Sequence, residues 1–208
     1  MTFSEKRFHK KLDKIRRLEE SGVLAKKKKK NRALSKFMSN KLAMLGAVMF
    51  ASKVIIEALP NIHLLGVLTV AYTLVYRRRA LVPIYVYVML NGLFSGFNFW
   101  WLPYTYIWTI LWGITMILPR NMPKKVAYIV YSLICALHGF AFGALYAPAQ
   151  ALMFGLDLDG MIAWIIAGLP FDLIHGVSNL GFGLLAVPIA ELLRKLSGEG
   201  AVKQNIKE

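Results

Sequence analysis

The sequence predicts an all-α integral membrane protein, a bundle of six transmembrane helices with its N and C termini in the cytoplasm. Two observations lead to this prediction. Hydrophobic residues make up 57% of the 208 residues and gather in long runs, as is typical of membrane-spanning segments. Clusters of Lys and Arg occupy every second connection between these runs, which indicates a chain that crosses the bilayer repeatedly.

Six apolar helices are expected, over residues 40–59, 62–76, 80–97, 104–118, 124–147 and 170–192. The basic connections are the N-terminal segment, Arg77–Arg79, Arg120–Lys125 and Arg194–Lys195, and the alternate connections contain no Lys or Arg. Because positively charged connections stay in the cytoplasm, we expect both termini there and the protein in the cell membrane.

Three segments follow from the distribution of charge. Residues 1–38 form a basic cytoplasmic arm, residues 39–195 the membrane domain, which we expect to bind a substrate, and residues 196–208 a cytoplasmic tail. The net charge of +15 is concentrated in the arm, where Lys26–Lys30 must stay solvated. We expect the arm to contact anionic lipid headgroups, at about 1 kcal/mol per charge near the surface. No RNA-binding motif accompanies the charge, so nucleic acid is not an expected partner.

The last expected helix contains three polar residues on one face. Asp172, His175 and Asn179 are spaced i, i+3 and i+7. An ionisable group in a membrane span costs at least roughly 2.5–3.5 kcal/mol, so such residues usually face an interior site. Pro170 suits the first turn of this helix, after a short helix within residues 150–168 that lies over the outer face. This arrangement places the polar face in the outer half of the membrane, where it suits a polar solute.

Other polar and aromatic residues near the outer connections are further candidates. The aromatic segment 97–104 is either an interfacial belt or a pocket wall that stacks on a ring. Lone polar residues elsewhere either line the pocket or serve solvated loops and helix packing. The candidate substrate-binding residues are Asp172, His175, Asn179, Asn98, Trp100, Trp101, Tyr104, His138, Glu57 and Asn61.

Several classes of catalytic site have no counterpart in the sequence. There is no phosphate-binding loop of the form G-x-x-x-x-G-K-[ST], no H-E-x-x-H and no G-x-S-x-G. His138, Asp172 and His175 have the chemistry to hold a metal ion, but their spacing is generic, so we predict no metal site and no cofactor. A lone cysteine, Cys135, excludes a disulfide framework. We therefore do not expect an enzyme.

Small residues form a stripe in the first expected span. Ala43, Ala47 and Ala51 follow one another at intervals of four residues, which permits another helix to approach closely. Such a stripe serves either packing within the bundle or docking of another membrane protein.

Over residues 38–195 the chain resembles the substrate-binding S-components of bacterial energy-coupling factor (ECF) vitamin transporters. The resemblance rests on six spans with both ends inside, on the alanine stripe, and on Leu169–Gly176 (LPFDLIHG). That last segment is similar to the L-P-F-N-x-I-K-G run of riboflavin-type members, whose Asn and Lys contact the vitamin. Here those positions are Asp172 and His175, a different donor pattern, which argues against riboflavin itself. The outer connections contain no Lys or Arg, which favours a neutral or cationic ring compound over a strongly anionic one.

The resemblance implies a mechanism and a set of partners. An S-component binds a vitamin-like small molecule in its outer half and topples inward when docked on a membrane-embedded coupling subunit with two ATPase subunits. In this chain the alanine stripe would be the docking surface for that coupling subunit. Two alternatives from the residues remain, a stand-alone small-solute carrier and a membrane scaffold with a lipid-binding basic arm.

Overall fold

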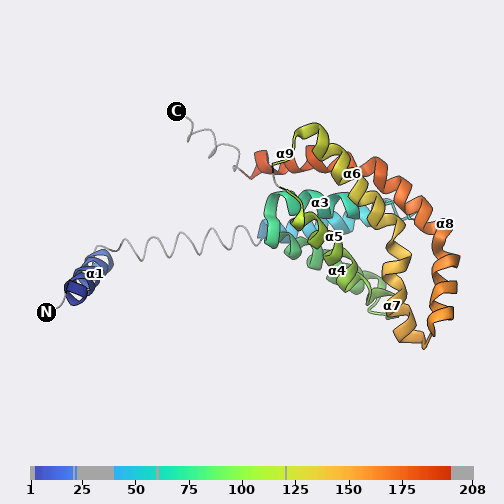
Figure 1. Ribbon diagram of the computed structural model, residues 1–208, viewed down its shortest axis with the longest axis horizontal. Helices are drawn as coiled ribbons and strands as arrows, with labels where there is room; N and C mark the ends of the chain where they lie inside the picture. Colours follow the sequence, from blue (N-terminus) through green and yellow to red (C-terminus); the bar gives the residue numbers. More distant parts are fainter. Residues whose placement is uncertain (1–2, 21, 23–39, 60, 120, 198–208) are drawn as a thin grey trace. The chain divides into compact units, whose positions relative to one another are not determined.

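The computed structural model describes residues 3–20, 22, 40–59, 61–119 and 121–197 (Figure 1). These residues are largely helical, and no strand occurs among them. The chain divides into two compact units, Met1–Lys41 and Leu42–Glu208.

The first unit contains α1, Phe3–Glu20, in which apolar residues recur along one side. Phe8, Leu12 and Ile15 are spaced by four and three residues and are all exposed. The flanking surface is charged, with Arg16 placed 3.9 Å from Asp13. The helix is therefore amphipathic. The expected lysine run Lys26–Lys30 lies outside the described residues.

The second unit is a bundle of helices, in which α3, α4, α5, α7 and α9 are each shorter than 16 residues. In chain order its elements are a helix over residues 40–55, α3 (Leu65–Tyr76), η1 (Arg77–Ala80), α4 (Leu81–Ser95), η2 (Phe99–Trp101), α5 (Tyr104–Ile117), α6 (Lys124–Phe140), α7 (Phe142–Phe154), α8 (Leu158–Gly183) and α9 (Ala186–Leu196). The first four expected helices thus have counterparts within a few residues of their predicted ends.

The C-terminal third of the unit differs from the prediction. The expected helix over 124–147 breaks at Ala141 and continues to Phe154, and the expected helix over 170–192 is divided between α8 and α9. A separate short helix within residues 150–168 was a wrong prediction, because α8 begins at Leu158 and runs without interruption past Pro170. Pro170 therefore lies inside a helix, not in its first turn, and α8 changes direction along its length (Figure 1).

The turn between α7 and α8 explains this difference. Gly155 ends α7 in the left-handed conformation, with φ 66°. Asp157 then caps α8, since its side chain accepts a hydrogen bond from the backbone N–H of Gly160 at 2.8 Å. A glycine stop followed two residues later by an aspartate cap joins the two helices as a tight hairpin.

Among the described residues, two helical stretches are long and apolar enough to cross a membrane. They are Lys124–Phe154, of 31 residues, and Leu158–Gly183, of 26 residues. The other apolar helices are shorter: α3 has 12 residues, which at about 1.5 Å per residue is less than the roughly 30 Å of a hydrocarbon core. Two helical stretches thus support membrane association. The six-span bundle remains a prediction.

The two long helical stretches pack closely where small residues meet. α6 lies alongside α8 (Figure 1). A Cβ added to Gly139 would lie 2.9 Å from the Cα of Gly176, and one added to Gly183 would lie 2.6 Å from the Cα of Ser132. The Ser132 hydroxyl also donates a hydrogen bond to the carbonyl of Leu180. Small residues with an interhelical hydrogen bond are typical of helix pairs in membranes.

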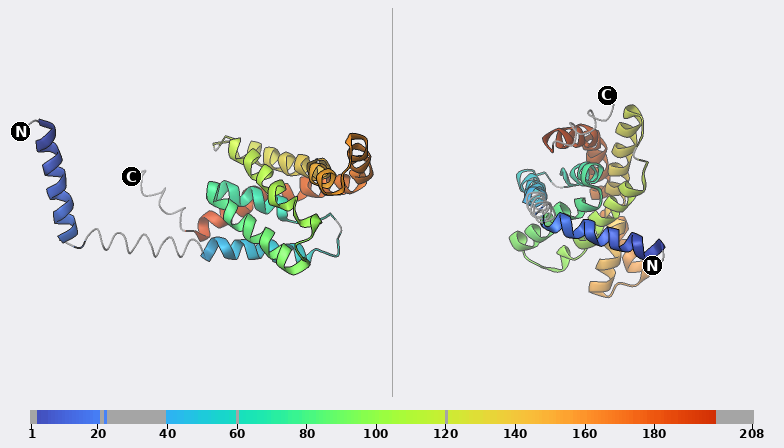
Figure 2. Two further views of the ribbon diagram at one scale, coloured as in Figure 1. Left: turned by 90° about the horizontal axis from the view of Figure 1, so that it is seen from below. Right: turned by 90° about the vertical axis from the view of Figure 1, so that its left-hand side faces the viewer.

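The helix over residues 40–55 packs on α3 and α4 through one face (Figure 2, left). A Cβ on Gly46 would lie 2.7 Å from the carbonyl oxygen of Pro83 in α4, and the Tyr72 hydroxyl of α3 donates to the carbonyl of Leu45 at 3.2 Å. The stripe of Ala43, Ala47 and Ala51 lies on the exposed side of this helix. The stripe is therefore not used for packing within the unit.

The helix ends that carry basic residues are joined by hydrogen bonds. Arg77 donates to the carbonyl of Met116 at 2.9 Å, near the C-terminus of α5. Arg194 donates to the carbonyl of Leu74 at 3.2 Å, near the C-terminus of α3. Cations at helix C-termini satisfy free carbonyl groups and oppose the helix dipole. We call this part of the bundle the basic end.

Candidate functional site

Asp172 is the charged centre of the candidate site. Its side chain is 6% exposed, and both carboxylate oxygens lie 3.0 Å from the backbone nitrogen of Gly143. Gly143 belongs to the first turn of α7, where backbone N–H groups have no partner within the helix. Asp172 therefore caps α7 from the neighbouring helix, at the positive end of its dipole. It forms no ion pair with any described residue, so most of its capacity to accept hydrogen bonds is unused.

Aromatic and imidazole rings surround the position next to Asp172. The ring of His175, one turn further along α8, lies 4.5 Å from that of His63 and 4.8 Å from that of Phe142. His138 of α6 lies 5.6 Å from Trp108 and 6.1 Å from Phe142. Three histidines thus reach one cluster of rings from the loop before α3, from α6 and from α8.

Several buried polar atoms in this cluster have no hydrogen-bond partner among the described residues. They include Nδ1 of His63, Nδ1 of His138, Nε2 of His175 and both amide atoms of Asn179. Asn179 is 1% exposed. A buried polar group without a partner costs roughly 1–3 kcal/mol, so a concentration of such groups is typical of a site that binds a polar molecule.

Two cavities open beside Phe142. One of about 320 Å³ is lined by the α7–α8 side of the cluster: Asn61, Phe142, Gly143, Tyr146, Gln150, Trp164, Gly168, Phe171 and Asp172. The other, of about 180 Å³, is lined by Lys53, Glu57, Leu59, Asn61, Ile62, His63, Tyr104, Phe142 and His175. Asn61 and Phe142 line both, so the two cavities are adjacent. We call them the Asp172 cavity and the His175 cavity.

The Asp172 cavity combines an acidic group with flat aromatic walls. Tyr146 and Trp164 stack on each other with ring centroids 5.6 Å apart and planes 16° from parallel. The Tyr146 hydroxyl donates to the carbonyl of Trp100 at 2.7 Å, which fixes that wall to the aromatic segment after α4. None of the described Lys or Arg residues lines this cavity. Its chemistry suits a ring compound that donates hydrogen bonds or bears a positive charge.

The structure brings only part of the predicted site together. Asp172, His175, His138, Asn61 and Tyr104 belong to the ring cluster or line one of its cavities, and Asn179 lies one turn beyond His175 on α8. Glu57 lines the His175 cavity, where it pairs with Lys53 at 2.5 Å.

The aromatic segment contributes less to the cluster than its composition suggests. Trp100 contacts it through its ring, 5.8 Å from that of Tyr104, and through its carbonyl. Asn98 and Trp101 instead line a separate hollow of about 410 Å³ with Phe97, Phe99 and Leu102. Trp101 donates its indole N–H to the carbonyl of Val88 at 2.8 Å, and this bond holds the ring on that side.

The sequence prediction missed several residues that form the site. His63, Phe142, Gly143, Tyr146 and Trp164 come from three different segments, and none belongs to a recognisable motif. His63 and Trp164 are polar or amphipathic residues in apolar surroundings, which is a signal available from sequence. Phe142 and Gly143 have no such signal, since their role depends on the break between α6 and α7.

Among the described residues, no group of three His, Cys, Asp or Glu side chains is placed to hold a metal ion. His138, Asp172 and His175 therefore do not form such a group. The cluster is arranged for hydrogen bonding and ring contacts.

Comparison with known proteins finds no protein family, curated protein or solved structure that matches this chain. Its function must therefore be argued from the site itself.

Proposed function

We propose that this protein is the substrate-binding S-component of an ECF-type importer, which captures a neutral or cationic heteroaromatic micronutrient. The observation that most supports the proposal is the Asp172 cavity, in which a buried carboxylate without an ion pair faces aromatic walls. A ring that donates hydrogen bonds would satisfy the carboxylate and stack on Tyr146 and Trp164.

The second support is the exposed alanine stripe. Ala43, Ala47 and Ala51 are exposed while Gly46 of the same helix makes the packing contact within the bundle. A smooth exposed surface of this kind suits docking of a helix from a membrane-embedded coupling subunit. Since the chain has no ATP-binding loop, energy for uptake would come from the two ATPase subunits of that module, and the chain itself would not be an enzyme.

The binding step is tested on the full-length protein with native mass spectrometry against a pooled library of vitamins and their precursors. We expect one heteroaromatic compound to bind. Asp172→Asn keeps an oxygen that can accept the hydrogen bond from the Gly143 N–H but removes the charge. It should therefore weaken the binding free energy of that compound by about 1.5–3 kcal/mol. Asp159→Asn, an exposed position in the first turn of α8, is the matched control and should leave the affinity unchanged.

Two results would contradict the proposal. If no compound in the library binds, the scaffold alternative gains support. If binding is found but Asp172→Asn and Asp159→Asn have the same affinity, the ligand lies elsewhere.

A further inference from the structure

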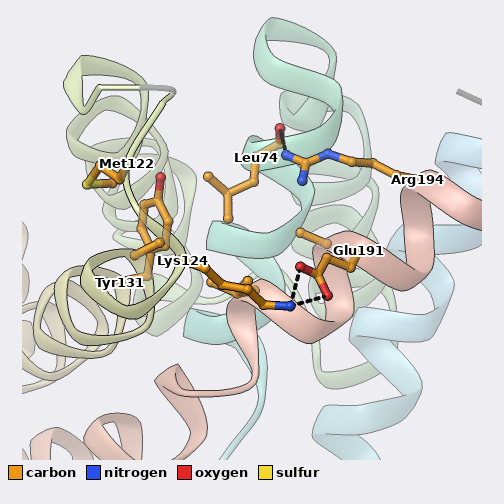
Figure 3. A pocket seen from close by; sticks show the side chains of 9 residues that line it. Leu74, Met122, Lys124, Tyr131, Glu191 and Arg194 are labelled. Carbon is orange, nitrogen blue, oxygen red and sulfur yellow. Dashed lines mark hydrogen bonds and ion pairs between the residues drawn. The ribbon is translucent and has the colours of Figure 1, made fainter. Parts of the chain in front are cut away.

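A further pocket lies at the basic end of the bundle, separate from the three cavities described above. It has a volume of about 180 Å³ and is lined by Leu74, Met122, Lys124, Ala127, Tyr131, Val187, Ala190, Glu191 and Arg194. These residues come from α3, the segment before α6, α6 itself and α9. Figure 3 shows Leu74 between Tyr131 and Met122 on one side and Arg194 on the other, with the Lys124–Glu191 ion pair beside them.

The polar groups of this pocket favour an anion. Tyr131 is only 4% exposed, and its hydroxyl makes no hydrogen bond to another described residue. Arg194 lines the same pocket, where its guanidinium donates to the carbonyl of Leu74 at 3.2 Å. Lys124 lies 2.9 Å from Glu191, so these two charges offset each other and the charge of Arg194 remains. A tyrosine hydroxyl and a guanidinium are both strong donors to phosphate oxygens.

The backbone adds to the same preference. Lys124 and Ala127 belong to the first turn of α6, a helix of 17 residues whose N-cap, Pro123, provides no side-chain hydrogen bond. Both residues line the pocket, so the positive end of the helix dipole lies beside it, while the N–H of Ala127 donates to the carbonyl of Pro123 at 2.9 Å. The helix dipole and the charge of Arg194 therefore favour the same sign of ligand charge.

Apolar side chains form part of the pocket wall and its surroundings. Leu74, Met122 and Val187 line it, and next to it α6 and α9 expose Val126, Leu192 and Leu196. In a membrane protein such exposed side chains face acyl chains. A ligand with a phosphate and hydrocarbon tails would contact both kinds of surface.

We propose that this pocket binds the phosphate of an anionic phospholipid. Arg194 and the Tyr131 hydroxyl donate hydrogen bonds to the phosphate oxygens. The acyl chains lie along the apolar surface of α6 and α9. This site is separate from the ring cluster and does not depend on the importer function.

The test measures the dissociation constant of phosphatidylglycerol for the full-length protein in neutral detergent, by native mass spectrometry at high salt, where contacts of exposed charges are screened. Phosphatidylcholine, which has no net charge, is the control lipid, and inorganic phosphate is the soluble competitor. We expect phosphatidylglycerol to bind at least about tenfold more tightly than phosphatidylcholine. Millimolar phosphate should not displace it, because phosphate has no contact with the apolar walls.

Four variants locate the lipid. Arg194→Gln should raise the dissociation constant of phosphatidylglycerol about tenfold, because a charge-assisted hydrogen bond is lost. Tyr131→Phe should weaken lipid binding about threefold to tenfold, and since that hydroxyl has no hydrogen-bond partner among the described residues, this variant separates binding from folding. Glu191→Gln removes the negative charge beside Lys124 and should tighten binding a few-fold. Lys195→Gln removes the same charge as Arg194→Gln at an exposed neighbour that does not line the pocket, and should change binding less than twofold.

The proposal is overturned if Lys195→Gln weakens the lipid as much as Arg194→Gln, which would mean diffuse attraction to a basic surface. It is equally overturned if Tyr131→Phe and Arg194→Gln both leave binding unchanged. Displacement of the lipid by inorganic phosphate would replace it with a site for a free anion.

Discussion

At the scale of single residues, the geometry of the candidate site depends on the contact between Gly143 and Asp172. The carboxylate has to approach the first turn of α7 closely in order to accept the N–H, and only a residue without a side chain leaves room for it. The same contact holds Asp172 at the wall of its cavity. One glycine therefore supports both the helix end and the position of the charged group.

Gly143→Ala tests this dependence. Its Cβ would overlap the Oδ2 atom of Asp172, so the carboxylate must move, at a cost of about 1–3 kcal/mol in unfolding free energy. Gly113→Ala in α5 is the matched control, since a Cβ there meets nothing within 4 Å, and it should leave the protein unchanged or slightly more stable. Thermal unfolding in detergent measures both variants. Equal midpoints would contradict the role given to Gly143.

At this scale the sequence predicts what is local. Asp172, His175 and Asn179 are spaced for one face of a helix, and all three are buried on α8. Trp101 shows the limit, because the side to which its ring turns depends on the carbonyl of Val88, thirteen residues away. No spacing within the segment 97–104 contains that information.

At the scale of secondary-structure elements, the candidate site depends on the packing of α6 against α8. Gly139, Gly176 and Gly183 allow the two backbones to come close, and the rings of His138 and His175 lie 6.1 Å and 4.8 Å from that of Phe142. The predicted boundaries were least accurate here. The sequence marks the turn through Gly155 and Asp157, but the apolar runs on both sides continue through Pro148 and Pro170, so proline was a misleading sign of a helix end.

Two glycines on α8 provide a matched test of this packing. A Cβ at Gly183 would lie 2.6 Å from the Cα of Ser132, so Gly183→Ala should force α6 and α8 apart and cost about 1–3 kcal/mol. A Cβ at Gly181 meets nothing within 4 Å, and Gly181→Ala should not destabilise the protein. The comparison is made by thermal unfolding in the same detergent. A destabilised Gly181→Ala would show that packing against α6 is not what governs these positions, since Ala is the better helix former.

The whole molecule poses the question of orientation in the membrane. In a Cys135→Ala background we expect a cysteine at Asp159→Cys to react with a membrane-impermeant maleimide added to intact cells. A cysteine at Lys125→Cys should react only after permeabilisation, because basic connections stay inside. Both positions are exposed in the protein, so reactivity reports the side of the membrane. Labelling of Lys125→Cys in intact cells would refute the proposed topology.

Coupling to a partner is also a property of the whole molecule. Ala47→Trp places a large ring on the exposed alanine stripe, so it should abolish uptake while ligand binding persists. Leu137→Trp adds a large ring at a side chain of α6 that is 64% exposed, and it should leave uptake intact. Radiolabelled uptake in cells and binding to purified protein distinguish the two steps. Uptake by the Ala47→Trp variant, or uptake without ATP, would favour a stand-alone carrier.

The tight turn between α7 and α8 also bears on how the chain enters a membrane. In the proposed orientation the two helices would insert as a pair, and the turn would cross the bilayer with the carboxylates of Asp157 and Asp159. A membrane potential that is negative inside drives anions outward by about 2.3 kcal/mol per charge per 100 mV. In the proposed orientation two carboxylates would gain about 4–5 kcal/mol at 100 mV. The cell's own electric field would thus help to pull the hairpin into place during biogenesis.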